Sequence, residues 1–140
     1  MFFDNPDSPL IKKYLQLYNP DNRSNEIDSI LDQLRDLMIQ SKQKSNKSKK
    51  INRGEVLNNY GVALYQKYYG SPNEKDNKIN EALEILEEAG RMKNKVAECN
   101  LGIYYFHLYT LEKEKKNKID IQQRKKYFQY AQKWLTRSVK

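Results

Sequence analysis

The fold is decided by two similar stretches, NYGVALY at residues 59–65 and NLGIYYF at residues 100–106, whose glycines, Gly61 and Gly102, are 41 residues apart. Each stretch is followed by small, large and small residues at steps of four and three: Ala82, Leu86 and Ala89 after the first, and Ala131, Leu135 and Ser138 after the second. On a helix such residues share one face, where small side chains let a neighbouring helix approach and the large one fills the space between them. We therefore predict two copies of an antiparallel helix pair.

The rest of the chain also carries helical spacing. Ser8-Pro9 predicts a helix start, and Asn19-Pro20 predicts its end. A second helix is expected from about Asn25, and Gly90 is placed where a left-handed residue closes a helix. Asp120 with Gln123 has capping-box spacing before a last helix, which we expect to carry Tyr127, Phe128, Ala131, Trp134 and Leu135 inward. No segment has the pattern of a β-strand, so the predicted class is all-α.

This pattern divides the chain into three parts. Residues 1–40 are predicted to form an N-terminal helical hairpin that acts as an atypical cap, and residues 41–53 a Lys-rich linker. Residues 54–140 hold the two helix pairs, 54–91 and 95–140. Because stacked pairs bury their faces only against neighbours and about three are needed for stability, we expect the hairpin to supply a third layer.

Over residues 54–140 the chain resembles the tetratricopeptide repeat family and its longer Sel1-like relatives. The matching packing positions are Leu57, Tyr60, Gly61, Leu64, Ala82, Leu86 and Ala89 in the first pair, and Leu101, Gly102, Tyr105, Ala131, Leu135 and Ser138 in the second. The chain departs from the family pattern at Glu98, where a large apolar residue is expected, in the long spacing inside each pair, and in lacking the usual closing Pro. The resemblance implies helix hairpins stacked as a short α-solenoid.

The resemblance also implies that the first helices of the pairs line a concave groove that binds another protein. The groove residues it implies are Asn58, Asn59, Val62 and Tyr65 from the first pair, and Val96, Asn100, Ile103 and Phe106 from the second. Asn59 and Asn100 have two interpretations, since their amides can bond a bound peptide backbone or tie neighbouring helices together. The family's carboxylate-binding members need Lys or Arg where this chain has Asn58, Val62 and Val96, so recognition of a chaperone C-terminal tail is disfavoured.

Charge offers a second interpretation. The 140 residues include 26 Lys and Arg against 18 Asp and Glu, a net charge of +8. A basic patch of Lys42, Lys44, Lys47, Lys49, Lys50 and Arg53 could contact phosphates, an acidic protein tail or an anionic membrane surface, or could be a solvated linker. The alternative function is therefore a basic helical protein that binds RNA, the ribosome or acidic tails such as those of tubulin.

Catalysis has little support in the sequence. A single cysteine, Cys99, and a single histidine, His107, cannot complete a zinc site or a Ser-His-Asp triad, and we expect both to pack within a helix. Glu81, Glu84, Glu87 and Glu88 are expected on a solvated helix face, and no Gly-rich phosphate loop occurs. We therefore expect no enzyme activity, cofactor, metal site or small-molecule substrate.

Apolar runs are too short to cross a bilayer, and the first residues lack the pattern of a secretory signal or transit peptide. The expectation is an intracellular protein, in the cytoplasm or in a cytoskeletal, ciliary or organellar assembly. The predicted function is a non-catalytic protein–protein interaction module, either a small adaptor or a structural subunit of a larger assembly.

Overall fold

The computed structural model describes residues 2–18, 25–42, 52–69, 75–114 and 121–140. The prediction of an all-α protein is confirmed, because this part of the chain holds six helices and no strand. The expected helix stop at Asn19-Pro20, most of the Lys-rich segment and the Asp120 cap lie outside the described residues. The helices are α1 (Pro9–Leu17), α2 (Asn25–Ser41), α3 (Arg53–Tyr68), α4 (Lys75–Arg91), α5 (Lys95–Glu114) and α6 (Ile121–Ser138).

Helix starts follow local chemistry. Ser8 and Pro9 stand at the N-cap and first position of α1, as predicted. The Asn52 side chain caps α3 by accepting from the Glu55 N–H at 3.1 Å. In the same way, the Asn94 side chain accepts from the Ala97 N–H at 2.9 Å at the start of α5. Each cap satisfies a backbone donor that has no partner within its helix.

The end of α4 differs from the prediction. Gly90 is helical, and the left-handed residue is Lys93, with φ 65°. The N–H of Lys93 donates to the Gly90 carbonyl at 2.9 Å, and that of Asn94 to the Ala89 carbonyl at 3.1 Å, which is a Schellman closure. Gly90 serves packing instead, because a Cβ there would lie 2.7 Å from Cζ3 of Trp134.

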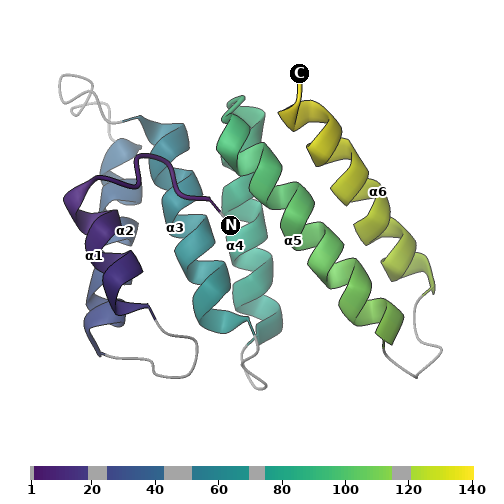
Figure 1. Cartoon of the computed structure of the whole chain (residues 1–140), viewed down its shortest axis with the longest axis horizontal. Helices are drawn as coiled ribbons and strands as arrows, with labels where there is room; N and C mark the ends of the chain where they lie inside the picture. The colour runs from purple at the N-terminus through teal and green to yellow at the C-terminus, as the bar shows by residue number, and fades with distance from the viewer. Residues whose placement is uncertain (1, 19–24, 43–51, 70–74, 115–120) are drawn as a thin grey trace.

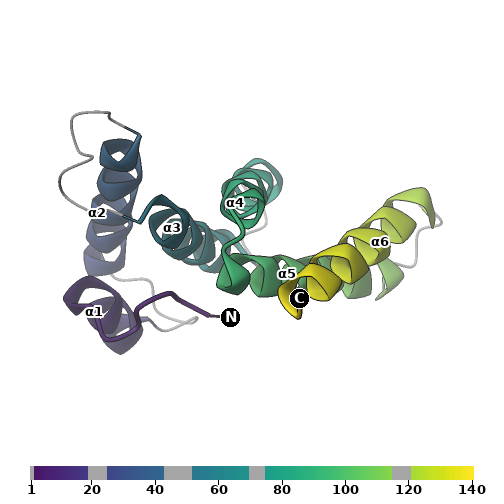
Figure 2. The same cartoon turned by 90° about the horizontal axis from the view of Figure 1, so that it is seen from above.

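Consecutive helices pack against each other in a row, as short stacked hairpins (Figure 1). Seen from above, α2 and α4 lie on one side of the row and α1 and α5 on the other, with α3 between (Figure 2). The first hairpin is fastened to α3 by a hydrogen bond of 2.6 Å from the Tyr14 hydroxyl to Gln66 and by an ion pair of 2.7 Å between Lys67 and Asp28. The helical row therefore includes the N-terminal hairpin as a layer against α3.

The α3–α4 and α5–α6 hairpins each contain the same kind of contact, between a glycine of the first helix and a leucine of the second. A Cβ on Gly61 would lie 2.7 Å from Cγ of Leu86, and a Cβ on Gly102 would lie 2.5 Å from Cδ2 of Leu135. The absence of a side chain at each glycine is what admits the leucine of the second helix. Most of the other expected packing residues are also buried: Leu57, Tyr60, Leu64, Ala82, Ala89, Leu101, Tyr105 and Ala131.

Helix α6 is less covered than expected. Leu135 is 40% exposed, Phe128 is also exposed, Ser138 is half-buried, and Trp134 and Ala131 are buried as predicted. The reason is position, because α6 packs chiefly on α5 and has no following helix on its other side within the described chain. Among the described helices, none is long and apolar enough to span a membrane.

Candidate functional site

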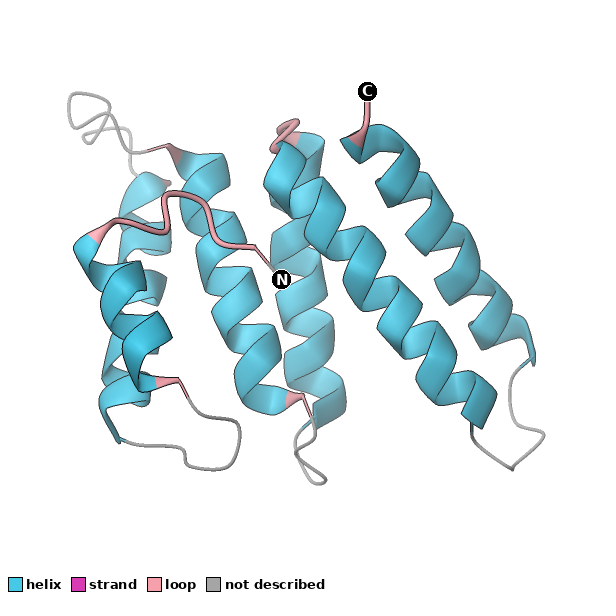
Figure 3. Ribbon diagram, viewed as in Figure 1, coloured by secondary structure: helices cyan, strands magenta, loops and turns pink. Residues whose placement is uncertain are grey.

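The most informative feature of the molecule is the position of its N-terminal segment. Residues 2–8 leave the start of α1, cross in front of α3 and end beside α5 (Figure 1). The same segment is a loop without helix or strand (Figure 3). It therefore lies on the side of the row formed by α1, α3 and α5, where the sequence predicted a groove.

Asn100 on α5 holds the backbone of Phe2 in two directions. The Phe2 N–H donates to Oδ1 of Asn100 at 2.9 Å, and Nδ2 of Asn100 donates to the Phe2 carbonyl at 2.8 Å. One side-chain amide thus takes the place that a neighbouring peptide unit has in a sheet.

Asn59 on α3 does the same for Asp4. The Asp4 N–H donates to Oδ1 of Asn59 at 2.8 Å, and Nδ2 of Asn59 donates to the Asp4 carbonyl at 3.1 Å. In extended chain, residues two apart present their backbone groups to the same side, about 6.6 Å apart. Two asparagines on neighbouring helices α3 and α5 therefore read positions i and i+2 of one extended segment.

Asn58 on α3 orients the Asn100 amide and also bonds the Phe2 carbonyl. Its Oδ1 accepts from Nδ2 of Asn100 at 2.8 Å, and its Nδ2 donates to the Phe2 carbonyl at 3.2 Å. Both Asn58 and Asn100 are fully buried. Because water does not reach their amides, these bonds satisfy the polar groups that would otherwise have no partner. Asn58 with Asn100 joins α3 to α5, and Asn59 and Asn100 bond the backbone of this chain's own residues 4 and 2, while binding of another chain's backbone stays a prediction.

Side chains of the segment also contact the helices. Oδ2 of Asp4 accepts from Nδ2 of Asn94 at 3.1 Å, at the N-terminus of α5. Burial raises the pKa of the Asp4 carboxyl, and hydrogen bonds from Asn94 and Asn58 oppose that rise. Phe3 packs edge-on against Tyr14 with ring centroids 5.3 Å apart, whereas the Phe2 side chain is 53% exposed.

Tyrosines continue the same face below the segment. The rings of Tyr65 on α3 and Tyr104 on α5 stack with centroids 3.7 Å apart. Burial raises the pKa of both hydroxyls, and neither hydroxyl has a hydrogen-bond partner among the described residues. The stack fixes the spacing of α3 and α5 and therefore the spacing of the asparagines above it.

The other groove residues predicted from sequence have mixed positions. Val62 and Tyr65 are buried, and the Tyr65 ring stacks on Tyr104. Val96 and Ile103 are half-buried, and Phe106 is exposed beside Tyr109. The structure therefore brings Asn58, Asn59 and Asn100 to one place and leaves the apolar members of the set outside it.

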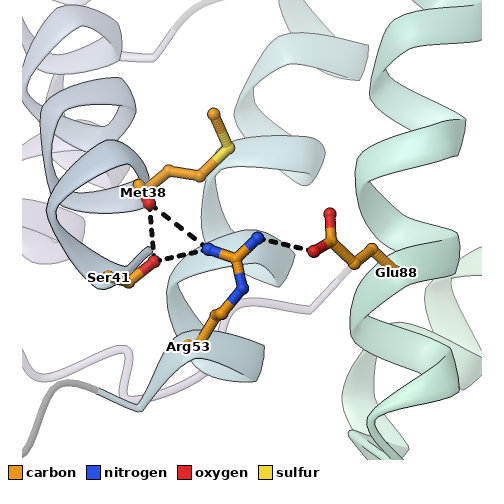
Figure 4. Close-up of polar contacts among 4 residues, drawn as sticks. All are labelled: Met38, Ser41, Arg53 and Glu88. Carbon is orange, nitrogen blue, oxygen red and sulfur yellow. Dashed lines mark hydrogen bonds and ion pairs between the residues drawn. The ribbon is translucent and has the colours of Figure 1, made fainter. Parts of the chain in front are cut away.

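Arg53, one residue of the predicted basic patch, pairs with neighbouring helices. Its guanidinium donates to Oε1 of Glu88 at 2.5 Å, to the Ser41 hydroxyl at 2.8 Å and to the Met38 carbonyl at 3.4 Å (Figure 4). These bonds join the end of α2 to α3 and α4. Lys42 is exposed, and Lys44, Lys47, Lys49 and Lys50 lie outside the described residues.

The acidic side chains of α4 are also less free than predicted. Glu88 pairs with Arg53, and Glu87 accepts from the Tyr105 hydroxyl of α5. His107, expected to pack within a helix, is exposed beside Tyr69 with ring centroids 6.1 Å apart. Among the described residues, no group of His, Cys, Asp or Glu is arranged to hold a metal ion.

The sequence did not point to two participants in the site, the segment at residues 2–4 and Asn94, or to the role of Glu98 elsewhere on α5. A usable signal for the segment was the presence of three asparagines within two otherwise apolar helical stretches, because buried amides require partners. Glu98 is 1% exposed and lies between Lys95 Nζ, 3.4 Å from Oε1, and Arg137 Nε, 3.7 Å from Oε2. It joins α5 to the end of α6 and takes no part in the groove.

Comparison of the sequence with protein-family models and with curated proteins, and of the structure with solved structures, finds no match.

Proposed function

We propose that this chain is a non-catalytic protein–protein interaction module that binds an extended segment of another protein on the α1–α3–α5 face. The observation that carries the proposal is the two-way pairing of Asn59 and Asn100 with the backbone of Asp4 and Phe2. A side-chain amide that pairs with both N–H and C=O of one residue recognises chain in an extended conformation, whatever its sequence.

The repeated helix pair supports the same proposal. The Gly61–Leu86 and Gly102–Leu135 contacts are equivalent in the two hairpins and are of the kind expected of a tetratricopeptide or Sel1-like repeat. Such stacking presents the first helix of each hairpin on one face, and this is where the asparagines lie. In this proposal the protein acts as a small adaptor or as a subunit of a larger assembly, in the cytoplasm or in a cytoskeletal or organellar structure.

A nucleic-acid or acidic-tail function is the alternative, favoured by the net charge of +8 and by exposed cations such as Lys125 and Lys126 on α6. Binding of that kind weakens steeply with salt, since it depends on release of counterions from phosphates. A groove that reads peptide backbone by hydrogen bonds should be much less sensitive to salt.

The test is affinity recovery from lysate with a chain that lacks residues 2–4, so that the groove is open. We expect a defined set of proteins that survives nuclease and high salt and that is lost when the bait carries Asn59→Ala. The matched control is Gln129→Ala, at an exposed amide on α6, which should leave recovery unchanged. Partners that disappear with nuclease or salt and ignore Asn59→Ala would assign the function to the basic segments instead.

A further inference from the structure

The α3–α5 face is covered by this chain's own residues 2–4, and the bonds to that segment indicate the ligand chemistry that the face can accept. We propose that the α3–α5 face binds a partner segment in which an aromatic residue is followed directly by an acidic residue, and that residues 2–4 compete for it in cis. This inference rests on the proposed function and adds to it the class of ligand and a means of regulation.

The backbone part of the recognition is general. Asn100 and Asn59 satisfy the N–H and C=O groups of Phe2 and Asp4, two residues apart, so any extended chain could form these four bonds. Asn58 fixes the orientation of the Asn100 amide by accepting one of its N–H bonds. The backbone bonds thus define the ligand's conformation and leave its identity to the side chains.

The side-chain part is selective at two of three positions. The middle residue, Phe3, inserts against Tyr14 of α1 and packs on the core. The last residue, Asp4, directs its carboxylate to Nδ2 of Asn94, whose side chain also caps the start of α5. The first residue, Phe2, is 53% exposed, and its backbone is bonded by Asn100.

The segment is joined to the helices by a separate, exposed turn. Asn5 has φ 49°, and the Ser8 N–H donates to the Asn5 carbonyl at 3.0 Å, while residues 5–7 are exposed. Helix α1 beyond this turn has attachments of its own, because Ile11 is buried and the Tyr14 hydroxyl donates to Gln66 of α3 at 2.6 Å. The segment can therefore leave the groove by a change at the turn while α1 stays in place.

A cis ligand on a short connection competes with an effective concentration on the order of millimolar. Only a partner with higher affinity, or one at high local concentration, would displace it. The arrangement therefore excludes weak, non-specific peptides from the groove.

The experiment uses the full chain and a variant that lacks residues 2–4, titrated with a labelled peptide of residues 1–7, MFFDNPD, and followed by fluorescence anisotropy and NMR. We expect saturable binding to the deletion variant and at least about tenfold weaker binding to the full chain, because the cis segment competes. Peptides with Phe3→Ala or Asp4→Ala should bind at least about threefold more weakly, and the matched control peptide with Asp7→Ala, at an exposed acidic residue, should bind like the parent.

Each outcome decides between explanations. Equal binding of a scrambled peptide would overturn the aromatic–acidic selectivity while the groove itself would stand. No binding of any peptide at about 1 mM to a folded deletion variant would overturn the inference, and the partner recovery described above would then judge the proposed function separately. If the deletion variant and the full-length Phe3→Ala, Asp4→Ala double variant both lose helical circular dichroism, the segment is part of the core and the inference is wrong.

Discussion

The hairpins α3–α4 and α5–α6 are built on the same glycine–leucine contact but differ in how they fill the space beside it. Four residues before each glycine, the first hairpin has Leu57, fully buried, and the second has Glu98, equally buried but charged. The leucine of the second helix is fully buried in the first case, as Leu86, and 40% exposed in the second, as Leu135. The burial of the residues between the two helices of a hairpin therefore depends on the position of the hairpin in the row as well as on its sequence pattern.

Glu98 is compatible with its site because cations reach it from the open side. Lys95 is exposed and Arg137 is half-buried while they approach its carboxylate, and Arg137 also lies over the Trp134 ring, 4.7 Å from its centroid. In the α3–α4 hairpin, α4 packs against both α3 and α5. Cations therefore have no open side from which to reach a buried carboxylate there. The buried carboxylate is therefore found in the last hairpin, where cations lie near it, and a leucine stands at the equivalent position of α3.

The largest expected effect comes from exchanging these two residues. Leu57→Glu should lower the free energy of unfolding by about 3–5 kcal/mol, because an uncompensated carboxylate would be buried. Glu98→Leu should raise it by about 1 kcal/mol, because the two cations freed can be hydrated and Lys95 keeps its bond to the Arg137 carbonyl. Urea unfolding followed by circular dichroism measures both. A strong loss in Glu98→Leu would show that the ion pairs hold α6 in place.

The glycines provide the next comparison. Gly61→Ala should cost about 2–3 kcal/mol, since its Cβ would meet Leu86, which is enclosed and has no space to move into. Gly102→Ala should change stability by about 1 kcal/mol or less, because Leu135 can swing toward solvent and Ala favours the helix.

At both glycines the nearest backbone atom of the partner helix would lie 3.3 Å from the added Cβ. The two substitutions therefore differ in the leucine side chain that they meet and not in their distance from the backbone. The double variant Gly61→Ala, Leu86→Ala serves as the control for direct contact. If it is no more stable than the sum of its single changes predicts, the cost at Gly61 does not come from Leu86.

Much of this architecture follows from sequence because it depends on local periodicity. The start of α1 at Ser8-Pro9 and the paired positions of Gly61 with Leu86 and Gly102 with Leu135 need only helical spacing and a repeat. The exposure of Leu135 does not follow in this way, because it depends on which helix lies at the end of the row. Gly90 was misassigned for a similar reason, since Trp134, 44 residues further along, requires the space.

The candidate site was half predictable. Asn59 and Asn100 stand out as amides in apolar stretches, and a peptide backbone was one of their two expected partners. The occupant could not be predicted, since residues 2–4 have no periodicity and reach partners 55 and 98 residues away. Contacts between residues so far apart in sequence cannot be predicted from local periodicity.

A smaller effect is expected from the asparagines themselves. Asn100→Ala should lower the free energy of unfolding by about 2 kcal/mol, because it releases Phe2 and leaves the buried Asn58 amide without one partner. Asn59→Ala should cost about 1 kcal/mol, since it releases only the Asp4 backbone. Thermal unfolding of the two variants, each with and without residues 2–4, separates the contributions. Costs that persist undiminished after the deletion would mean that the amides stabilise the helices rather than the segment.

The smallest effect concerns the connection between the two hairpins. Lys93 adopts φ 65° at the closing position of α4, a conformation that costs a residue with a side chain about 1 kcal/mol relative to Gly. Lys93→Gly should therefore raise the free energy of unfolding by about 0.5–1 kcal/mol, measured by urea unfolding. The control is Arg91→Gly, two residues earlier and still helical, which should lower stability by about 1 kcal/mol. A loss of stability in both variants would show that the closure between α4 and α5 is not left-handed at Lys93 in solution, and with it the angle at which the two hairpins meet would have to be revised.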